Sequence, residues 1–298
     1  MLMTLLRLVF IAGALFFLML LLRAWWQRRQ RGELESTPFG KVAAIGFVAN
    51  FLDTLGIGSF AVKTACYKHF GLIDDRVLPG TLNGQCVLPT AVQSLIFVGM
   101  VDVDPVTLVS MMMAAALGAA IGARHVAAFD RQKVRVVMAG SLLVVAALIF
   151  CGLLGLFPLG GEAMGLSGTK LAIALVGNFL FGVLMNVGIG LFAPCMTLIY
   201  LLGMHPIAAF PIMMGSTAVL SVFSASTFIR RGAFDAQAVL AVAIFGPIGV
   251  VLAAFLVRSL DLAMLKWLVG IVVLYTAWSM YRAWLSGRQP AVSGPATV

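Results

Sequence analysis

This chain contains an internal repeat, and the repeat constrains the possible folds more than any other feature. Moving the sequence along itself by 132 residues aligns Gly56–Gly58 with Gly188–Gly190, and a shift of 131 aligns Gly118 with Gly249. Further pairs are Phe47 with Phe179, Phe60 with Phe192, Pro79 with Pro211 and Asp104 with Asp235. Glycine, proline and aspartate dominate the matches, and they fix backbone geometry and loop ends rather than fill apolar space. Within a membrane protein, such duplication is typical of a transporter.

The composition indicates a protein that lies in a lipid bilayer. Hydrophobic residues make up 62% of the 298 residues and charged residues only 10%, whereas roughly a quarter of a soluble domain is charged. The net charge is +9, but the basic residues cluster in short loops between apolar runs. That pattern orients membrane helices and differs from the basic face of a nucleic-acid-binding protein. We therefore expect contact with the lipid bilayer and no nucleic-acid partner.

Apolar stretches of about 20 residues predict membrane spans. They are Leu5–Leu22, Leu78–Met100, Pro105–Ala123, Val134–Phe157, Pro206–Ile229, Ala236–Val257 and Leu262–Leu285. We expect Leu5–Leu22 to be retained, because no small-residue cleavage site follows it. Two longer segments, Lys41–Phe70 and Lys170–Gly203, carry the repeated Gly-Ile-Gly near their middle. Each of them either crosses once or folds back as a helical hairpin.

Loop charge distinguishes these two possibilities. Arg23–Arg31 follows the first span and should be cytoplasmic, because positive loops remain inside. If Lys41–Phe70 crossed once, the basic loop Arg124–Arg135 would lie outside and the acidic turn Asp102–Asp104 inside. Folding back reverses both placements. Each repeat then crosses the membrane an odd number of times, so the two copies lie in opposite orientations and their tips approach each other near mid-membrane.

The predicted fold is therefore an all-α polytopic membrane protein with two inverted-topology repeats. Each repeat is a broken or re-entrant helical hairpin plus three transmembrane helices, and one extra helix precedes them. The expected parts are an N-terminal helix and cytoplasmic linker (1–38), a first repeat (39–158), a second repeat (168–285) and a disordered tail (286–298). We expect a multi-pass protein of a bacterial-type inner membrane, with the N-terminus outside and the C-terminus cytoplasmic.

The two glycine tips are the predicted substrate site. Broken helices at membrane depth line cavities, and a restarting helix offers unpaired N–H groups and the positive end of its dipole to an anion. Close helix packing is the alternative explanation for such glycines. Glycines of the two tips that we expect to contact substrate are Gly56, Gly58, Gly188 and Gly190, together with the adjacent Ser59.

Two charged residues lie deep within a predicted membrane segment, both near the first tip. They are Asp53 and Lys63, and charge within a membrane is costly enough to indicate function. In one interpretation they pair with each other across the hairpin. In the other, Lys63 neutralises a bound anion and Asp53 couples transport to a proton or cation. Neutral groups expected to bond substrate oxygens are Thr81, Asn83, Gln85, Ser216 and Thr217.

The same segments resemble a known family. The stretch "NFLDTLGIGSFAVKTACYKHFG" with "LPGTLNGQ", and its counterpart "NVGIGLFAPCMTLIYLLGM" with "FPIMMGST", are similar to the sulfite exporter TauE/SafE family of membrane permeases. The resemblance covers about residues 40 to 285. It implies export of a small anion, notably sulfite or an organosulfur compound. The chain departs from the family pattern after Gly58, where Ser59 and Phe60 follow.

The remaining features predict structure rather than chemistry. We expect the four cysteines to pack as small apolar residues, and Asn50, Asn178 and Asn186 to join helices. The GxxxG pattern Gly118–Gly122 predicts close packing, either within the protomer or in a possible homodimer. No catalytic residue, metal site or cofactor is expected, and no P-loop is present. An anion channel of the same fold remains an alternative function, as does a membrane-embedded enzyme or assembly factor.

Overall fold

The computed structural model describes residues 2–56, 58–129, 161–188 and 190–259. These residues form nine α-helices and one 3₁₀ helix. They are α1 (Leu2–Arg31), α2 (Phe39–Thr54), α3 (Ser59–His69), α4 (Leu78–Phe97), α5 (Pro105–Val126), α7 (Gly168–Met185), α8 (Phe192–Leu201), η1 (Pro206–Ala208), α9 (Ala209–Arg230) and α10 (Ala236–Ser259). The predicted spans Val134–Phe157 and Leu262–Leu285 and the predicted tail lie outside the described residues.

The expected membrane character is confirmed. Within the described ranges, five segments are long and apolar enough to cross a bilayer: Leu2–Arg31, Pro105–Val126, Gly168–Met185, Pro206–Arg230 and Ala236–Leu256. The predicted span Leu78–Met100 becomes α4, which does not meet this measure of apolarity. Helix α4 packs against α1, α9 and α10, and nearly all of its side chains are buried. A helix enclosed by other helices needs no lipid-facing apolar surface, so it can carry polar groups.

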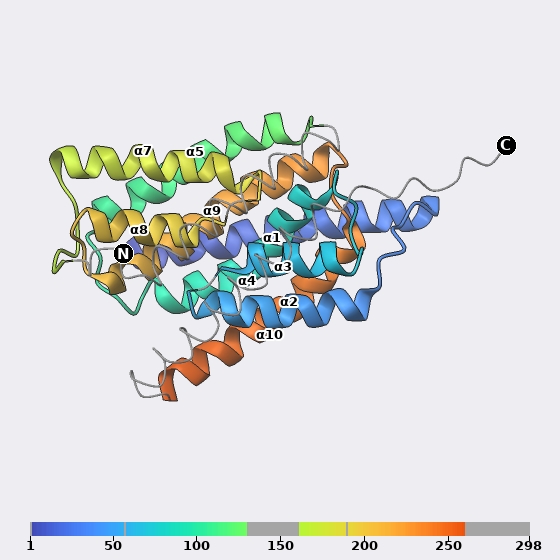
Figure 1. The fold of residues 1–298 in the computed structure, drawn as a ribbon, viewed down its shortest axis with the longest axis horizontal. Helices are drawn as coiled ribbons and strands as arrows, with labels where there is room; N and C mark the ends of the chain where they lie inside the picture. The colour runs from blue at the N-terminus through green and yellow to red at the C-terminus, as the bar shows by residue number, and fades with distance from the viewer. Residues whose placement is uncertain (1, 57, 130–160, 189, 260–298) are drawn as a thin grey trace.

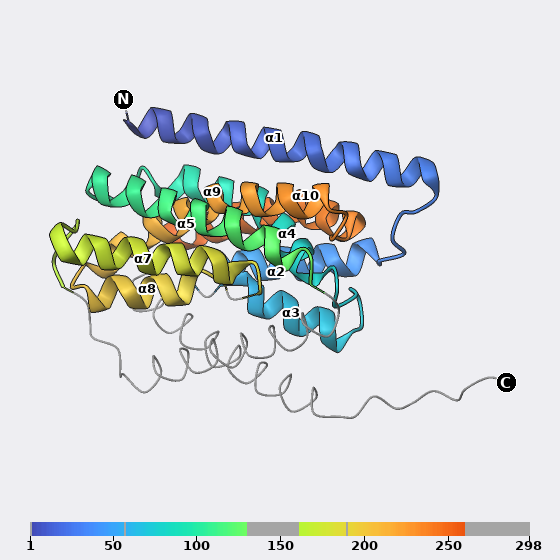
Figure 2. The ribbon, with the colours of Figure 1, turned by 90° about the horizontal axis from the view of Figure 1, so that it is seen from above.

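Helix α1 is an addition on the outside of the bundle. Figure 2 shows it along one side, next to α9 and α10. Its buried side chains Leu6, Phe10, Phe17 and Leu21 recur at four and seven residues, which places them on one helical stripe. Large apolar side chains on the rest of the helix, such as Leu15, are exposed, as expected of a lipid-facing surface.

The two Gly-Ile-Gly segments break the helices at the predicted positions. Helix α2 ends at Thr54, and α3 begins at Ser59 after Gly56 and Gly58, whose φ angles are +89° and +86°. Gly188 has φ of +99° between α7 and α8. Only glycine adopts positive φ angles without strain, so the chain can reverse its direction sharply at both places. Figure 1 shows α3 and α8 returning beside α2 and α7, with the two hairpins extending from opposite ends of the bundle.

The returning helices are short. At 1.5 Å per residue, the 11 residues of α3 and the 10 residues of α8 span about 15–16 Å, roughly half of a bilayer core. Each hairpin therefore places its tip near the middle of the bundle. The described helices thus have the form expected of re-entrant hairpins, while the opposite orientation of two complete repeats stays a prediction.

Contacts between the two halves follow the repeat. Helix α2 packs against α10, and α7 packs against α5. A Cβ atom on Gly118 of α5 would lie 2.0 Å from the carbonyl oxygen of Phe179, and one on Gly249 of α10 would lie 2.4 Å from that of Phe47. These residues are the pairs that the sequence repeat aligns. The glycine pattern at Gly118 therefore packs helices within the protomer.

The loops at the two ends of the bundle differ in charge. At one end, Arg28 of α1 forms an ion pair with Glu35 and donates a hydrogen bond to the carbonyl oxygen of Phe234 at 2.9 Å. At the other end, the backbone N–H of Asp104 donates to the carbonyl oxygen of Met164 at 2.9 Å. The ends of α1, α3, α5 and α9 that carry basic residues thus gather on one side, as Figure 1 shows. Which side is cytoplasmic stays a prediction.

Candidate functional site

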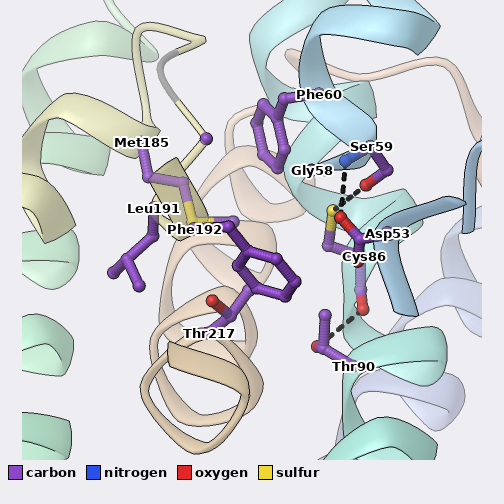
Figure 3. Close-up of a pocket in the computed structure, with 11 residues that line it drawn as sticks. Asp53, Gly58, Ser59, Phe60, Cys86, Thr90, Met185, Leu191, Phe192 and Thr217 are labelled. Atoms are coloured by element: carbon purple, nitrogen blue, oxygen red, sulfur yellow. Dashed lines mark hydrogen bonds between the residues drawn. The ribbon is translucent and has the colours of Figure 1, made fainter. Parts of the chain in front are cut away.

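The two hairpin tips meet at a small buried cavity (Figure 3). Its lining residues come from both halves of the chain: Asp53, Gly58, Ser59, Phe60, Cys86, Thr90, Met185, Gly190, Leu191, Phe192 and Thr217. The cavity has barely the room that one water molecule needs, so an anion of several heavy atoms does not fit as it stands. A larger anion would fit here only if the residues that line the cavity moved apart.

The two halves line the cavity with different chemistry. The first hairpin and α4 contribute a carboxylate, two hydroxyls and a thiol, from Asp53, Ser59, Thr90 and Cys86. The second hairpin contributes Met185, Leu191 and Phe192, which are apolar. Figure 3 shows these two groups on opposite sides, with Phe60 and Phe192 projecting into the space between the tips. Phe60 of the first hairpin and Thr217 of α9 are exceptions, so the division between the two halves is incomplete.

Asp53 binds the first turn of α3. One carboxylate oxygen accepts the backbone N–H of Ser59 at 2.5 Å, and the other accepts Nε2 of Gln93 at 3.0 Å. The N-cap residue Gly58 has no side chain to accept these helix-terminal N–H groups, and the glycine turn brings Ser59 back toward the end of α2. Asp53 is only 3% exposed. Its carboxylate therefore already holds the helix N-terminus that the sequence assigned to a substrate.

Lys63 is fully buried one turn beyond Ser59, behind the cavity wall. Its ammonium lies 3.6 Å from the Sγ atom of Cys86 and 5.9 Å from the centroid of the Phe60 ring. Among the described residues, no carboxylate lies within 4.0 Å of it, so the direct pair with Asp53 is not formed. Lys63 and Asp53 interact electrostatically without direct contact, and Cys86 lies near both.

The structure separates the predicted neutral groups. Thr217 lines the cavity, and Asn83 lies beside the second tip, 3.5 Å from the carbonyl oxygen of Met185. The Oδ1 atom of Asn83 is buried and has no hydrogen-bond partner among the described residues, which leaves it free to bond an added group. Gly190 also lines the cavity, whereas Gly56 and Gly188 shape the turns without lining it.

Three other predicted groups are engaged in structural contacts. Gln85 accepts the Tyr67 hydroxyl at 3.0 Å and donates to the carbonyl oxygen of Ala238 at 3.1 Å. Thr81 accepts the backbone N–H of Asp235 at 2.9 Å, at the end of the bundle, and Ser216 accepts Nδ2 of Asn178 at 3.0 Å. Asn178 and Asn186 join helices as expected, through the carbonyl oxygens of Met111 and Ala119.

Sequence reasoning missed several residues of the site. Phe60 and Phe192 were aligned by the repeat but not assigned to the cavity, and Cys86 was taken for packing alone. On α4, Cys86, Thr90 and Gln93 are spaced by four and three residues, which puts them on one helical face. This polar stripe in a predicted span was the available signal.

Comparison with known proteins finds one family that is similar to the C-terminal part of the chain. The family model described as Sulfite exporter TauE/SafE matches residues 170–298. The match begins within α7 and includes the second hairpin tip with Gly188 and Gly190, so the resemblance stated from the sequence is confirmed over this half. No curated protein and no solved structure gives a significant match to the chain.

Proposed function

We propose that this membrane transporter of the sulfite exporter TauE/SafE family, identified by residues 170–298, exports a small sulfur-containing anion such as sulfite or an organosulfonate. The observation that carries the proposal is the meeting of two broken-helix tips at one buried cavity. In secondary transporters, discontinuous helices bind the substrate where related halves meet. Interrupted backbone at this depth has groups free to bind a substrate, which continuous helices lack.

The proposed mechanism is alternating access between two inverted units. It is supported by hairpins that extend from opposite ends of the bundle and by the repeat-related packing of α2 with α10 and of α5 with α7. Because the cavity is this small, each opening requires one tip to withdraw from the other. Phe60 and Phe192 stand on the two tips and are 4% and 3% exposed, so their displacement would open the site.

The site residues have distinct proposed roles. Lys63 supplies the positive charge for the anion, since it is buried and contacts no carboxylate within the part of the chain that the structure describes. The backbone of Gly58 and Gly190 and the hydroxyls of Ser59 and Thr217 adjoin the substrate oxygens. We expect the anionic group to lie toward the first hairpin, because Ser59, Thr90 and Cys86, most of the polar lining residues, come from the first half.

Flux in proteoliposomes tests the proposal. Purified protein should take up radiolabelled sulfite with saturation, and unlabelled sulfite inside the vesicles should accelerate entry by counterflow. A channel of this fold would pass sulfite without saturation or counterflow, and that result would replace the carrier by a pore. A membrane-embedded enzyme or assembly factor would pass no anion. If sulfite gives no flux, sulfoacetate and thiosulfate as labelled substrates decide whether the anion or the transport function is misassigned.

A further inference from the structure

We propose that Asp53 is a resident anion that the substrate must replace, and that its displaced carboxylate takes up a proton which then travels with the substrate. The inference rests on the proposed function, because it concerns how the same site accepts and releases its anion. It assigns to Asp53 a coupling ion, a direction of coupling and a place in the transport cycle.

The position of the carboxylate is the first argument. Asp53 lines the cavity between the tips, and its Oδ1 atom accepts the Ser59 N–H at 2.5 Å. This N–H belongs to the first turn of α3, where backbone donors and the helix dipole favour a negative charge. A substrate anion at the first tip would need the same donor. The substrate-free protein has filled that place with its own side chain.

Charge balance is the second argument. Among the described residues, the charged and titratable groups that face Asp53 are Lys63 from α3 and Cys86 from α4. Between residues 236 and 256, α10, which packs against α2, carries no charged residue, and Lys41 of α2 lies three turns from Asp53. One buried ammonium can balance one buried anion. A second anion beside an ionised Asp53 would lack a counter-ion, and an unpaired buried charge is strongly disfavoured.

The second contact of Asp53 shows how the displaced state can be held. Gln93 donates its Nε2 to both the Asp53 carboxylate and the hydroxyl of Thr54, each at 3.0 Å, while its Oε1 atom is buried without a partner. A carboxyl group has an O–H to donate only when it is protonated. The amide that bonds Asp53 thus carries an unused acceptor, to which a protonated Asp53 could donate and an ionised Asp53 could not.

The cycle balances in protons, and for a monoanion it also keeps the net charge of the site constant, because Lys63 offsets either the Asp53 carboxylate or the substrate. On one side of the membrane, substrate takes the Ser59 N–H, a proton from solution forms an O–H bond on the Asp53 carboxylate, and Lys63 balances the bound anion. On the other side, the substrate leaves, the O–H bond breaks, the proton enters solution and the carboxylate returns to Ser59. One proton therefore moves in the same direction as each anion.

The second tip lacks this device. The repeat aligns Asp53 with Met185 and Lys63 with Cys195, both of which are fully buried. No carboxylate from the second hairpin lines the cavity. The coupling therefore belongs to the first hairpin alone, and one proton rather than two accompanies each anion.

Two measurements on the full-length protein test the inference, with sulfite as the probe. The first is sulfite affinity from thermal shift between pH 6 and 9 (about three pH units) for wild type, Asp53→Asn and Asp235→Asn. Asp235 is a matched control, because its buried carboxylate also accepts a helix N-terminal N–H, that of Ala238 at 2.8 Å, but at the end of the bundle. The ionisation of sulfite is common to all three proteins, so it cancels in the ratio of their dissociation constants.

We expect the sulfite affinity of wild type to weaken with rising pH relative to that of Asp53→Asn. Where Asp53 must take up a proton before sulfite binds, the ratio of the two dissociation constants should change by about tenfold per pH unit. Asp235→Asn should follow wild type. In proteoliposomes with an entrapped pH dye, Asp53→Asn should move one proton fewer per sulfite than wild type.

Other outcomes would decide against the inference in distinguishable ways. Equal pH profiles and equal proton counts with intact sulfite flux would overturn the resident-anion role and leave the carrier proposal standing. Absence of sulfite binding and flux in the wild type would overturn both. If Asp53→Asn does not fold, Gln93→Leu decides. This variant removes both the donor to the ionised carboxylate and the acceptor proposed for its protonated form, so its sulfite affinity should depend on pH differently from that of wild type, and an identical pH profile would refute the inference.

Discussion

The close packing of α5 against α7 predicts that adding a single methyl group at Gly118 will push these two helices apart and destabilise the protein. In Gly118→Ala, the new Cβ atom would lie 2.0 Å from the carbonyl oxygen of Phe179 and 2.9 Å from its carbon. Both atoms belong to the α7 main chain, so no side-chain rotation can relieve the contact. To reach an ordinary contact of 3.4 Å, the oxygen would have to withdraw by about 1.4 Å, and α7 with it.

The magnitude follows from two opposing effects. Overpacking of this kind lowers the stability of the folded protein by about 1–3 kcal/mol. Alanine in place of glycine within a helix raises it by at most about 1 kcal/mol. We therefore expect a net loss of stability for Gly118→Ala. Gly249→Ala, in the repeat-related contact, should lose less, because its Cβ would lie 2.4 Å from the Phe47 oxygen. The matched control is Gly40→Ala in α2, where a Cβ would meet nothing within 4 Å and only the gain remains.

The assay is thermal unfolding of the purified proteins in detergent. The expected order of melting temperature is Gly40→Ala at or above wild type, then Gly249→Ala, then Gly118→Ala lowest by several degrees. Since the two contacts lie on different helix pairs, the double variant should show the sum of the single losses. Equal melting temperatures for Gly118→Ala and Gly40→Ala would refute the claim that α5 and α7 meet backbone to backbone.

Two further predictions concern single charged residues. Lys63→Met should lower the melting temperature and abolish stabilisation by sulfite, because it leaves the buried Asp53 carboxylate without its counter-ion and removes the positive charge for the anion. Lys68→Met, at an exposed ion pair, should retain the sulfite response, and a response that survived in Lys63→Met would remove Lys63 from the site. The backbone N–H of Thr107, bonded to the Asp104 carboxylate at the start of α5, holds the pKa of Asp104 below its usual 3.8. Its contribution to stability is therefore complete above pH 3.8 and is lost as pH falls through the lowered value. Acid unfolding followed by circular dichroism should be less steep in Asp104→Asn, and an unchanged acid limb would show that this cap contributes nothing.

The overall path of the chain could be predicted because a few residues determine it. Gly56, Gly58 and Gly188 break helices where a run of apolar residues would otherwise continue, and loop charge decides that the chain turns back there. Gly118 and Gly249 were recognisable as packing positions, since only the absence of a side chain permits backbone contact. These signals are local, or they repeat at a fixed period, so the sequence alone displays them.

The site itself could be predicted only in part, because the partner of a polar side chain depends on tertiary packing. Asn83 and Gln85 are two residues apart on α4 and face different neighbours: Asn83 reaches the second tip, whereas Gln85 bonds Tyr67 and the backbone of α10. The spacing along one helix cannot tell which direction holds the cavity. The contact of Asp53 with Gln93 joins residues 40 positions apart, and no repeat or motif marks it.

If one proton accompanies each anion, the charge of the substrate determines the direction of transport. A sulfite dianion moving with one proton carries a net charge of −1, so an inside-negative potential drives it outward by about 2.3 kcal/mol per 100 mV. An alkaline interior opposes the outward movement of the proton by only about 1.4 kcal/mol per pH unit. A monoanionic sulfonate that moves together with one proton carries no net charge, so the membrane potential does not drive it and the proton gradient alone would drive it inward. We therefore expect an inside-negative potassium diffusion potential to accelerate efflux of sulfite from vesicles at alkaline pH, and to leave net efflux of a monoanionic sulfonate unchanged. In Asp53→Asn, the same potential should also drive the sulfonate outward, because without the proton its full charge crosses the membrane. A sulfonate flux that responded to potential in the wild type would contradict a coupling of one proton to each anion.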